Sequence, residues 1–290
     1  MTTRTRPSIC AEEAIQTQDS GLGTTYERWA LYRFLERIRQ EYAIQSVLEG
    51  PGDGITGIAY LNSLGLARSG AQVTLAATEP QRAAFARGIW QRYAPPAHQP
   101  DVRVIDPPGS LTEFEAQSDL AWNFNVINRH SHPRGLLEEM ARASRRYVLV
   151  VVPNCKNYGF FLHRLQHRAS GEAWDHGPPE LLAAAPFQQM FVALGLRVRE
   201  IAWVDCPWWP DIVDFGAMLT SFLPFLDGAA RRLKPQNRLA WPADGLPYFE
   251  PEKYPQVHQH MQRLAVFEDC RWKGITQRFA HHVAVLAEKP

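Results

Sequence analysis

The sequence predicts an α/β fold, namely a doubly wound, Rossmann-like sheet of seven strands with a C-terminal insertion. Two observations carry this prediction. From residue 26 onward, short apolar runs alternate with longer segments of helical periodicity, which is typical of a sheet covered by helices on both faces. A glycine-rich turn follows the first apolar run, as in folds that bind a ligand at the carboxyl ends of parallel strands.

Length and composition limit the classes of function. The 290 residues fit one large domain, and a formal charge of +1 gives no support to nucleic-acid binding, which needs clustered positive charge. Four cysteines lie far apart, which indicates reduced thiols in a cytoplasmic protein. The sequence has no apolar run of about 18 residues, so we expect no membrane segment.

The expected elements follow from periodicity and from Pro and Gly punctuation. Strands are predicted at 44–48, 71–77, 102–105, 119–126, 147–152, 196–204 and 280–287, and helices at 26–42, 58–69, 80–93, 133–144 and 186–194. The domain organisation that follows is an N-terminal tail (1–24), a cofactor-binding core (25–204), an insertion (205–279) and a final core strand (280–290). The insertion holds a strongly apolar helix-like stretch at 215–225, which indicates either a lid over the site or the interface of a homodimer.

The stretch Val47–Gly57 resembles the first motif of class I S-adenosylmethionine-dependent methyltransferases, in which an acidic residue at a strand end precedes a glycine loop. Later segments resemble the family's later strands and helices in the same order: Asp119–Trp122, His130–Ala143, Arg145–Asn154, Phe191–Val198 and His281–Ala287. The resemblance implies a seven-stranded sheet in which the last strand is antiparallel and lies between the fifth and the sixth. It also implies S-adenosylmethionine as the cofactor.

The chain departs from the family pattern in two places. Counted from Glu49, the glycines fall one residue early, at Gly50, Gly52 and Gly54. The second strand ends at Ala77, where the family has an acidic residue that binds the ribose hydroxyls. The nearest acid, Glu79, either takes that role or caps the following helix, and both alternatives stay open.

The resemblance and the expected position of each strand end select the site residues. Cofactor-binding residues are expected at Glu49, Gly50, Gly52, Asp53, Gly54, Glu79, Asp106 and Asn125. Residues that follow the later strands are expected to contact a substrate: Asn154, Tyr158, His176, Trp208 and Trp209. His130 and His163 are the candidate general bases. The pairs His130-x-His132 and His258-x-His260 lack acidic or Cys partners, so no metal site is predicted.

Three functions remain open. The first is methyl transfer from S-adenosylmethionine to a small-molecule acceptor, with aromatic residues lining its site. The second is a protein that has lost activity and acts as a binding or scaffold partner, which the two departures favour. The third is an NAD-dependent oxidoreductase, because Gly52-x-Gly54-x-x-Gly57 also matches the dinucleotide fingerprint. The third function predicts a sheet without an antiparallel final strand.

Overall fold

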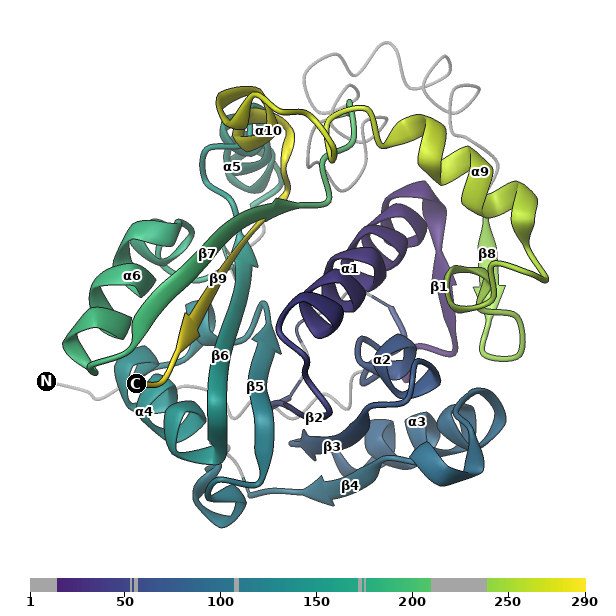
Figure 1. Cartoon of the computed structure of the whole chain (residues 1–290). Helices are drawn as coiled ribbons and strands as arrows, with labels where there is room; N and C mark the ends of the chain where they lie inside the picture. The colour runs from purple at the N-terminus through teal and green to yellow at the C-terminus, as the bar shows by residue number, and fades with distance from the viewer. Residues whose placement is uncertain are drawn as a thin grey trace, which may run out of the picture.

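A seven-stranded sheet forms the centre of the molecule (Figure 1). The computed structural model describes residues 15–52, 54, 57–106, 110–171, 174, 176–209 and 239–290. The strand order is β4-β3-β2-β5-β6-β9-β7. The strands are β2 (Ser46–Glu49), β3 (Gln72–Ala77), β4 (Asp101–Val104), β5 (Ser118–Phe124), β6 (Ser144–Pro153), β7 (Arg197–Val204) and β9 (His282–Glu288).

The last strand confirms the predicted fold class. β9 pairs antiparallel with both β6 and β7, whereas the other described pairs in this sheet are parallel. His282, at the start of β9, lies opposite Pro153 at the end of β6 and Val204 at the end of β7. The reversal therefore brings the first residues of β9 to the edge where the parallel strands end, which we call the carboxyl edge.

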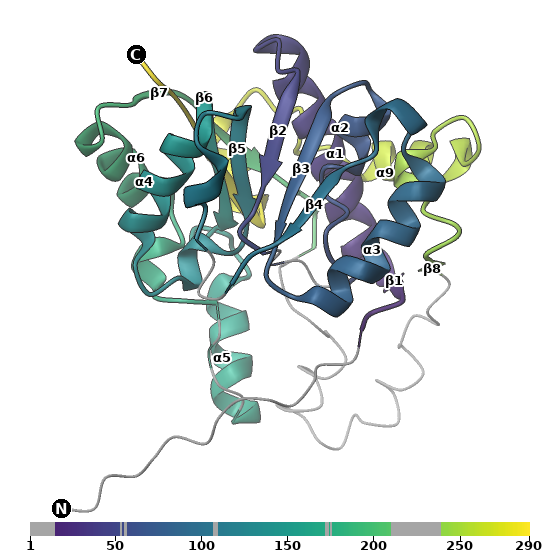
Figure 2. The ribbon, with the colours of Figure 1, turned by 90° about the horizontal axis from the view of Figure 1, so that it is seen from below.

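Helices cover both faces of the sheet. The α-helices are α1 (Gly21–Glu41), α2 (Leu64–Arg68), α3 (Pro80–Tyr93), α4 (Pro133–Ala143), α5 (Phe160–Ser170), α6 (Ala184–Ala193), α9 (Pro255–Leu264) and α10 (Lys273–Phe279). Side chains alternate along the strands, so that Leu149 and Val151 join the core under α1, α2 and α3, while Val148 and Val150 join the core under α4 and α6. Figure 2 shows these two helix layers, with α5 apart from both.

The helix predicted at 58–69 is much shorter in the structure, where α2 covers only Leu64–Arg68. Residues 58–60 instead form hydrogen bonds with residues that are distant in sequence. Asp19 accepts a hydrogen bond from the backbone N–H of Ile58 at 2.7 Å, and the Tyr60 carbonyl accepts one from Trp90 Nε1 at 2.8 Å. Tyr60 also has a φ of 62°, which ends any helical run. Tertiary contacts thus override the local helical pattern.

Folded structure begins within the predicted tail 1–24. β1 (Gln18–Ser20) pairs with β8 (Ala240–Pro242), and α1 starts at Gly21. Asp19 is fully buried and its carboxylate lies 3.0 Å from Arg28 Nε. The strand pair ties the segment before α1 to the part of the chain that follows residue 239, and the ion pair ties it to α1.

The described part of the predicted insertion 205–279 contributes to the core. Tyr248, Phe249 and Met261 are buried and belong to the same core cluster as α1. The apolar stretch 215–225 lies outside the described residues, so its role as lid or dimer interface remains a prediction. α5, α9 and α10 were not predicted from the sequence.

Two further expectations concern the described residues only. Cys155, Cys206 and Cys270 form no disulfide, as their spacing predicts. Among the described helices, none combines the length and the apolar character needed to cross a membrane.

Candidate active site at the carboxyl edge

The glycine loop after β2 lies against the carboxyl ends of its neighbouring strands. Three of its amides donate to strand carbonyls: Gly50 to Trp122 (3.0 Å), Gly52 to Ala76 (2.9 Å) and Gly54 to Phe124 (3.0 Å). In nucleotide-binding loops such N–H groups bind the ligand instead. The sheet thus already satisfies these three amides, and cofactor binding by Gly50, Gly52 and Gly54 remains a prediction. Asp53 lies outside the described residues.

The same loop leaves no room for a side chain at its tightest point. A Cβ built on Gly54 would lie 2.5 Å from the Asn125 carbonyl oxygen and 2.6 Å from that of Phe124. A Cβ on Gly50 would lie 2.7 Å from the Ala76 carbonyl oxygen. Glycine is required here because the loop approaches backbone atoms of β3 and of the turn after β5.

The acidic residues expected at the cofactor have different surroundings. Glu49 is buried at the end of β2, and its Oε2 accepts a hydrogen bond from the Ser63 N–H at 3.0 Å, at the start of α2. Glu79 forms an ion pair with Arg82 at 2.8 Å, one turn along α3. Asp106 follows β4 and is exposed. A contact with a cofactor remains a prediction for all three acids.

The turn after β5 has buried amide oxygens with no hydrogen-bond partner among the described residues. Oδ1 of Asn125 and Oδ1 of Asn128 are both in this condition. Asn125 has a φ of 54°, which is unusual for a residue other than glycine. Its backbone oxygen accepts a hydrogen bond from Arg129 Nε at 2.9 Å, and this bond stabilises the conformation. Leaving a buried acceptor unsatisfied costs about 1–3 kcal/mol, so a ligand that donates hydrogen bonds would bind favourably here.

A cluster of titratable groups lies beside Asn125. The side-chain Nδ2 of Asn125 is 3.1 Å from Nε2 of His282, and Nδ1 of His282 is 3.5 Å from Oδ2 of Asp205. The same carboxylate oxygen is 3.0 Å from Nδ1 of His281. Glu27 on α1 completes the group, with its Oε2 3.7 Å from Nε2 of His282. We call these residues the His282 cluster: Glu27, Asn125, Asp205, His281 and His282.

The hydrogen bonds of His282 indicate which nitrogen carries the proton. The amide N–H of Asn125 donates to Nε2, which leaves Nδ1 as the protonated nitrogen facing Asp205. Burial raises the pKa of the Asp205 carboxyl, but the adjacent His281 and His282 outweigh it and hold that pKa below its ordinary value. Asp205 is therefore a carboxylate able to stabilise a positive charge on His282.

Glu268 is a second acid near this cluster, and its side chain is partly buried. Its Oε1 accepts hydrogen bonds from the Cys206 N–H at 2.6 Å and from the Tyr26 hydroxyl at 3.3 Å. Burial, together with the charge of Asp205, raises the pKa of Glu268 to about 7. Asp205 is thus ionised, whereas Glu268 titrates near neutral pH. Neighbouring carboxyls commonly differ in pKa in this way when their environments differ.

The structure brings three of the expected substrate residues together. The Tyr158 hydroxyl donates to the Trp208 carbonyl at 2.7 Å, and the Trp208 and Trp209 rings are 5.7 Å apart. Nε2 of His281 lies 3.2 Å from the Trp209 carbonyl oxygen, which joins this aromatic group to the His282 cluster. Trp208 is 62% exposed, so its ring is accessible to a ligand.

Asn154, in contrast, has a structural environment. Its Nδ2 donates to the carbonyls of Gln277 and Ala280, and its Oδ1 accepts from the Lys156 N–H at 3.1 Å. These bonds attach the turn after β6 to the end of α10. Asn154 is therefore committed to backbone groups, and a substrate contact by it remains only a prediction.

The two histidines expected as bases are in different places. His130 follows the short 3-10 helix η3 (Ile127–Arg129), and its Nδ1 accepts a hydrogen bond from the His132 N–H at 3.1 Å. His163 lies on α5, where its Nε2 is 3.1 Å from Nε2 of His167. The ring of His176 is 4.8 Å from that of His163. His163 and His176 are thus neighbours, although we expected one as base and the other as substrate contact.

Sequence reasoning missed His282, Asp205, Glu27 and His167. His282 was recognised only as part of a strand, although an antiparallel last strand must start where the parallel strands end. That geometry was a usable signal for His282. For His167, the signal was the four-residue spacing from His163, which places two side chains on one helix face. Nothing in the sequence indicates Glu27, which only the packing of α1 brings to the cluster.

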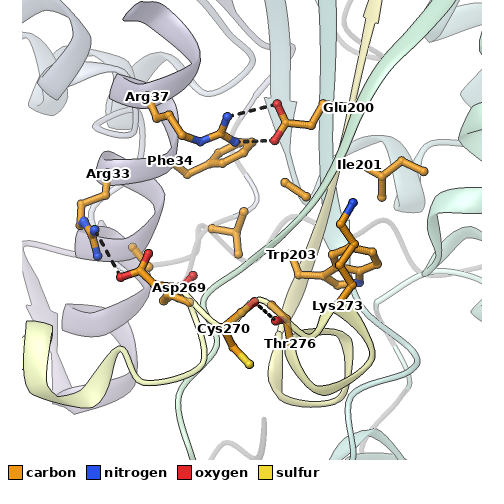
Figure 3. A pocket seen from close by; sticks show the side chains of 14 residues that line it. Arg33, Phe34, Arg37, Glu200, Ile201, Trp203, Asp269, Cys270, Lys273 and Thr276 are labelled. Atoms are coloured by element: carbon orange, nitrogen blue, oxygen red, sulfur yellow. Dashed lines mark hydrogen bonds and ion pairs between the residues drawn. The ribbon is translucent and has the colours of Figure 1, made fainter. Parts of the chain in front are cut away.

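A pocket of about 360 Å³ lies elsewhere, between α1 and β7 (Figure 3). Four of its charged side chains form ion pairs: Arg37 is 2.5 Å from Glu200, and Arg33 is 3.8 Å from Asp269. In doubly wound sheets ligands bind at the carboxyl edge rather than between an outer strand and its covering helix. The His282 cluster is therefore the better candidate site.

No protein-family model and no curated protein matches this sequence. Several solved structures are similar in fold. Magnesium protoporphyrin IX methyltransferase from Synechocystis, crystallised with S-adenosylhomocysteine, is 13% identical with a TM-score of 0.48 over 66% of this chain and 85% of that chain. A putative methyltransferase from Bacillus halodurans is 11% identical with a TM-score of 0.47 over 88% and 98% of the two chains. The cyclase SpnF is 14% identical with a TM-score of 0.45 over 96% and 88%. One such fold hosts many functions.

Proposed function

We propose that this chain transfers a methyl group from S-adenosylmethionine to a small molecule at the carboxyl edge. The observation that carries the proposal is Asn125, whose buried Oδ1 lacks a partner among the described residues while its Nδ2 faces His282. S-adenosylmethionine has an ammonium and an amino group that can donate to such an oxygen. The reversed β9 supports the proposal, and it argues against the NAD-dependent alternative, which predicts no antiparallel final strand.

Asn125 and Asn128 fit the cofactor as hydrogen-bond acceptors. Glu49 ends β2, and Glu79 and Asp106 follow the ends of β3 and β4 by two residues. When bound, S-adenosylmethionine supplies a methyl group on a sulfonium that needs no further activation. The tasks left to this chain are alignment of the acceptor, exclusion of water and removal of a proton.

His282 is the proposed general base. Its Nε2 takes the proton of an acceptor hydroxyl or amine, and Asp205 stabilises the resulting imidazolium from the Nδ1 side. Asn125 orients the ring until the acceptor arrives. Tyr158, Trp208 and Trp209 present aromatic surface next to this group, which suits a planar or apolar acceptor.

A binding or scaffold role is the second candidate. It is favoured by the amides of Gly50, Gly52 and Gly54, which are bonded to the sheet instead of being open to a ligand. The two candidates differ in cofactor affinity, because a protein without methyl-transfer activity has no need to bind S-adenosylmethionine.

Calorimetric titration of the full chain with S-adenosylmethionine and, separately, with NAD tests the proposal. We expect binding of the first ligand and none of the second, with Asn125→Ala weakening the affinity about tenfold through loss of one hydrogen bond to a charged donor. Absence of S-adenosylmethionine binding at millimolar concentration would reject methyl transfer and leave the scaffold role.

The base is tested by His282→Gln, with His132→Gln as the matched control at an exposed site. In an assay that follows transfer of a labelled methyl group to a panel of small molecules, we expect His282→Gln to lower kcat about 10²–10⁴-fold. The affinity for S-adenosylmethionine should change little, and the acidic limb of the pH profile should disappear. A lower affinity with an unchanged kcat would assign His282 to binding only.

A further inference from the structure

Three histidines meet beside the carboxyl edge, outside the His282 cluster. His163 and His167 lie one turn apart on α5, and their Nε2 atoms are 3.1 Å apart. His176 approaches from the segment after α5, and one ligand atom from each of the three histidines lies within 4.8 Å of the other two. We propose that His163, His167 and His176 bind one divalent transition-metal ion of the zinc type.

The distances fit such an ion. Zinc binds imidazole nitrogens at about 2.0–2.1 Å with tetrahedral geometry, which separates neighbouring ligand atoms by about 3.3 Å. The 3.1 Å between His163 and His167 is close to this value. The third nitrogen needs a movement of at most about 1.5 Å to reach tetrahedral spacing. His167 and His176 are only half-buried, so their rings have the freedom to make this adjustment.

The surrounding residues hold the three rings in place. The Trp174 ring lies 5.8 Å from the ring of His163, 5.3 Å from that of His167 and 4.8 Å from that of His176. Asn128 Nδ2 donates to the His176 carbonyl at 2.8 Å, which fixes the backbone that carries the third histidine. Metal sites depend on such support, because ligands positioned before binding lose less entropy.

Gly177 gives a second anchor for this segment. It has a φ of 84°, and a Cβ on it would lie 2.0 Å from the Asn128 carbonyl oxygen. The Trp174 Nε1–H donates to the Gly177 carbonyl at 2.6 Å. The segment that presents His176 is therefore pressed onto η3, the turn that also follows Asn125 and β5.

The ligand set selects the class of metal. Three neutral imidazoles suit zinc, copper, nickel or iron, whereas magnesium and calcium prefer oxygen ligands. Three protein ligands leave a fourth position for water or for an oxygen or nitrogen of a bound molecule. Without a metal, the same rings are explained by a hydrogen bond between two neutral histidines and by contacts with Trp174.

Titration of the untagged full chain with Zn²⁺ after treatment with a chelator separates the two explanations. We expect one ion per chain with micromolar or tighter affinity, and a tetrahedral visible spectrum when Co²⁺ replaces Zn²⁺. His167→Ala and His176→Ala should each weaken binding at least a hundredfold, and His260→Ala, at an exposed site, should leave it unchanged. His167→Gln repeats the test if an alanine variant fails to fold.

Affinity weaker than millimolar, or an affinity that none of the His167 and His176 variants changes, would overturn the proposal. No S-adenosylmethionine is present in this titration. Its outcome is therefore independent of whether the chain transfers methyl groups.

Discussion

The two sides of the carboxyl edge treat their polar groups differently. Beside the glycine loop, buried polar groups around Asp19 are bonded to one another. Arg28 donates from Nε to Asp19 at 3.0 Å, from Nη1 to Asn62 at 2.6 Å and from Nη2 to the Ile58 carbonyl. The Tyr248 hydroxyl also donates to Asp19. Nothing in this Asp19 network is directed to a ligand.

On the β5, β6 and β9 side, buried groups gather without being fully satisfied. Oδ1 of Asn125 and of Asn128 lack partners among the described residues, and ionisable groups lie within a few ångströms of one another. Such a concentration of buried charge costs stability and persists at sites of function. The described amides of the glycine loop are thus bonded to the sheet, whereas the unsatisfied and ionisable groups gather around Asn125 and the histidines.

The largest expected effect is loss of the Asp19 network. In Arg28→Met the buried carboxylate of Asp19 loses its counter-charge, which we expect to lower the free energy of unfolding by about 3–5 kcal/mol. Unfolding in urea measures this change in the free energy of unfolding. Arg33→Met, which removes the exposed partner of Asp269, should cost at most about 1 kcal/mol. Equal effects of the two variants would contradict the structural role of Asp19 and Arg28.

On the other side, Glu268 should make stability depend on pH. Because burial raises its folded pKa from 4.5 to about 7, the folded state holds a proton that the unfolded state has lost. The protonated Glu268 therefore contributes its full stabilisation of the folded state below pH 4.5, and this stabilisation is lost as the pH rises through about 7. It amounts to about 3 kcal/mol at most.

Unfolding of the wild type and Glu268→Gln at a series of pH values isolates this contribution. The difference in free energy of unfolding between the wild type and Glu268→Gln should change as the pH rises from about 4.5 to 7. Glu252→Gln, which replaces an exposed acid, should differ from the wild type by the same amount at each pH. A difference that stays constant with pH would mean that Glu268 is ionised throughout the folded state.

Next in size is Gly54→Ala. The new methyl group would meet two backbone oxygens at 2.5 and 2.6 Å, neither of which can rotate away, so we expect a loss of about 1–3 kcal/mol. Gly88→Ala, on an exposed part of α3 with nothing within 4 Å, should instead stabilise the protein by about 0.5–1 kcal/mol. Thermal unfolding compares them, and tolerance of both would contradict the tight packing of the loop.

The smallest expected effect concerns Glu79. Its side chain is 44% exposed and pairs with Arg82, so Glu79→Gln should change the free energy of unfolding by less than about 0.5 kcal/mol. We also expect the affinity for S-adenosylmethionine to stay within threefold, since the carboxylate acts on α3. A tenfold weaker affinity would instead assign Glu79 to the ribose.

Patterns that depend on local sequence were read correctly. α3 was predicted at 80–93 with its observed ends, because a proline starts it and its apolar residues recur at helical spacing. β6 was recognised from its unbroken apolar run, since a central parallel strand is buried on both faces. The helix at 58–69 was overestimated because Asp19 and Trp90, distant in sequence, determine the conformation of its first half.

The candidate site was predicted less well than the fold. Asn125, which follows β5, was expected among the cofactor-binding residues, and Tyr158, Trp208 and Trp209 were expected to contact a substrate. His163 and His176 were identified individually, but their common neighbour His167 was not. A strand or helix is determined mainly by nearby residues, whereas a site joins side chains from several elements.

The sequence by itself determined the doubly wound sheet and the approximate positions of its strands, because periodicity and turn residues act over short distances. The reversed last strand was expected only from the resemblance to the methyltransferase family. The tertiary structure decided how polar groups are used. Packing of β2 between β3 and β5 directs the loop amides to the sheet. The antiparallel entry of β9 brings His282 to Asp205 and Asn125, and the contacts of His176 and Gly177 with Asn128 on η3 place His176 beside α5. These contacts depend on three-dimensional proximity, which no local pattern records.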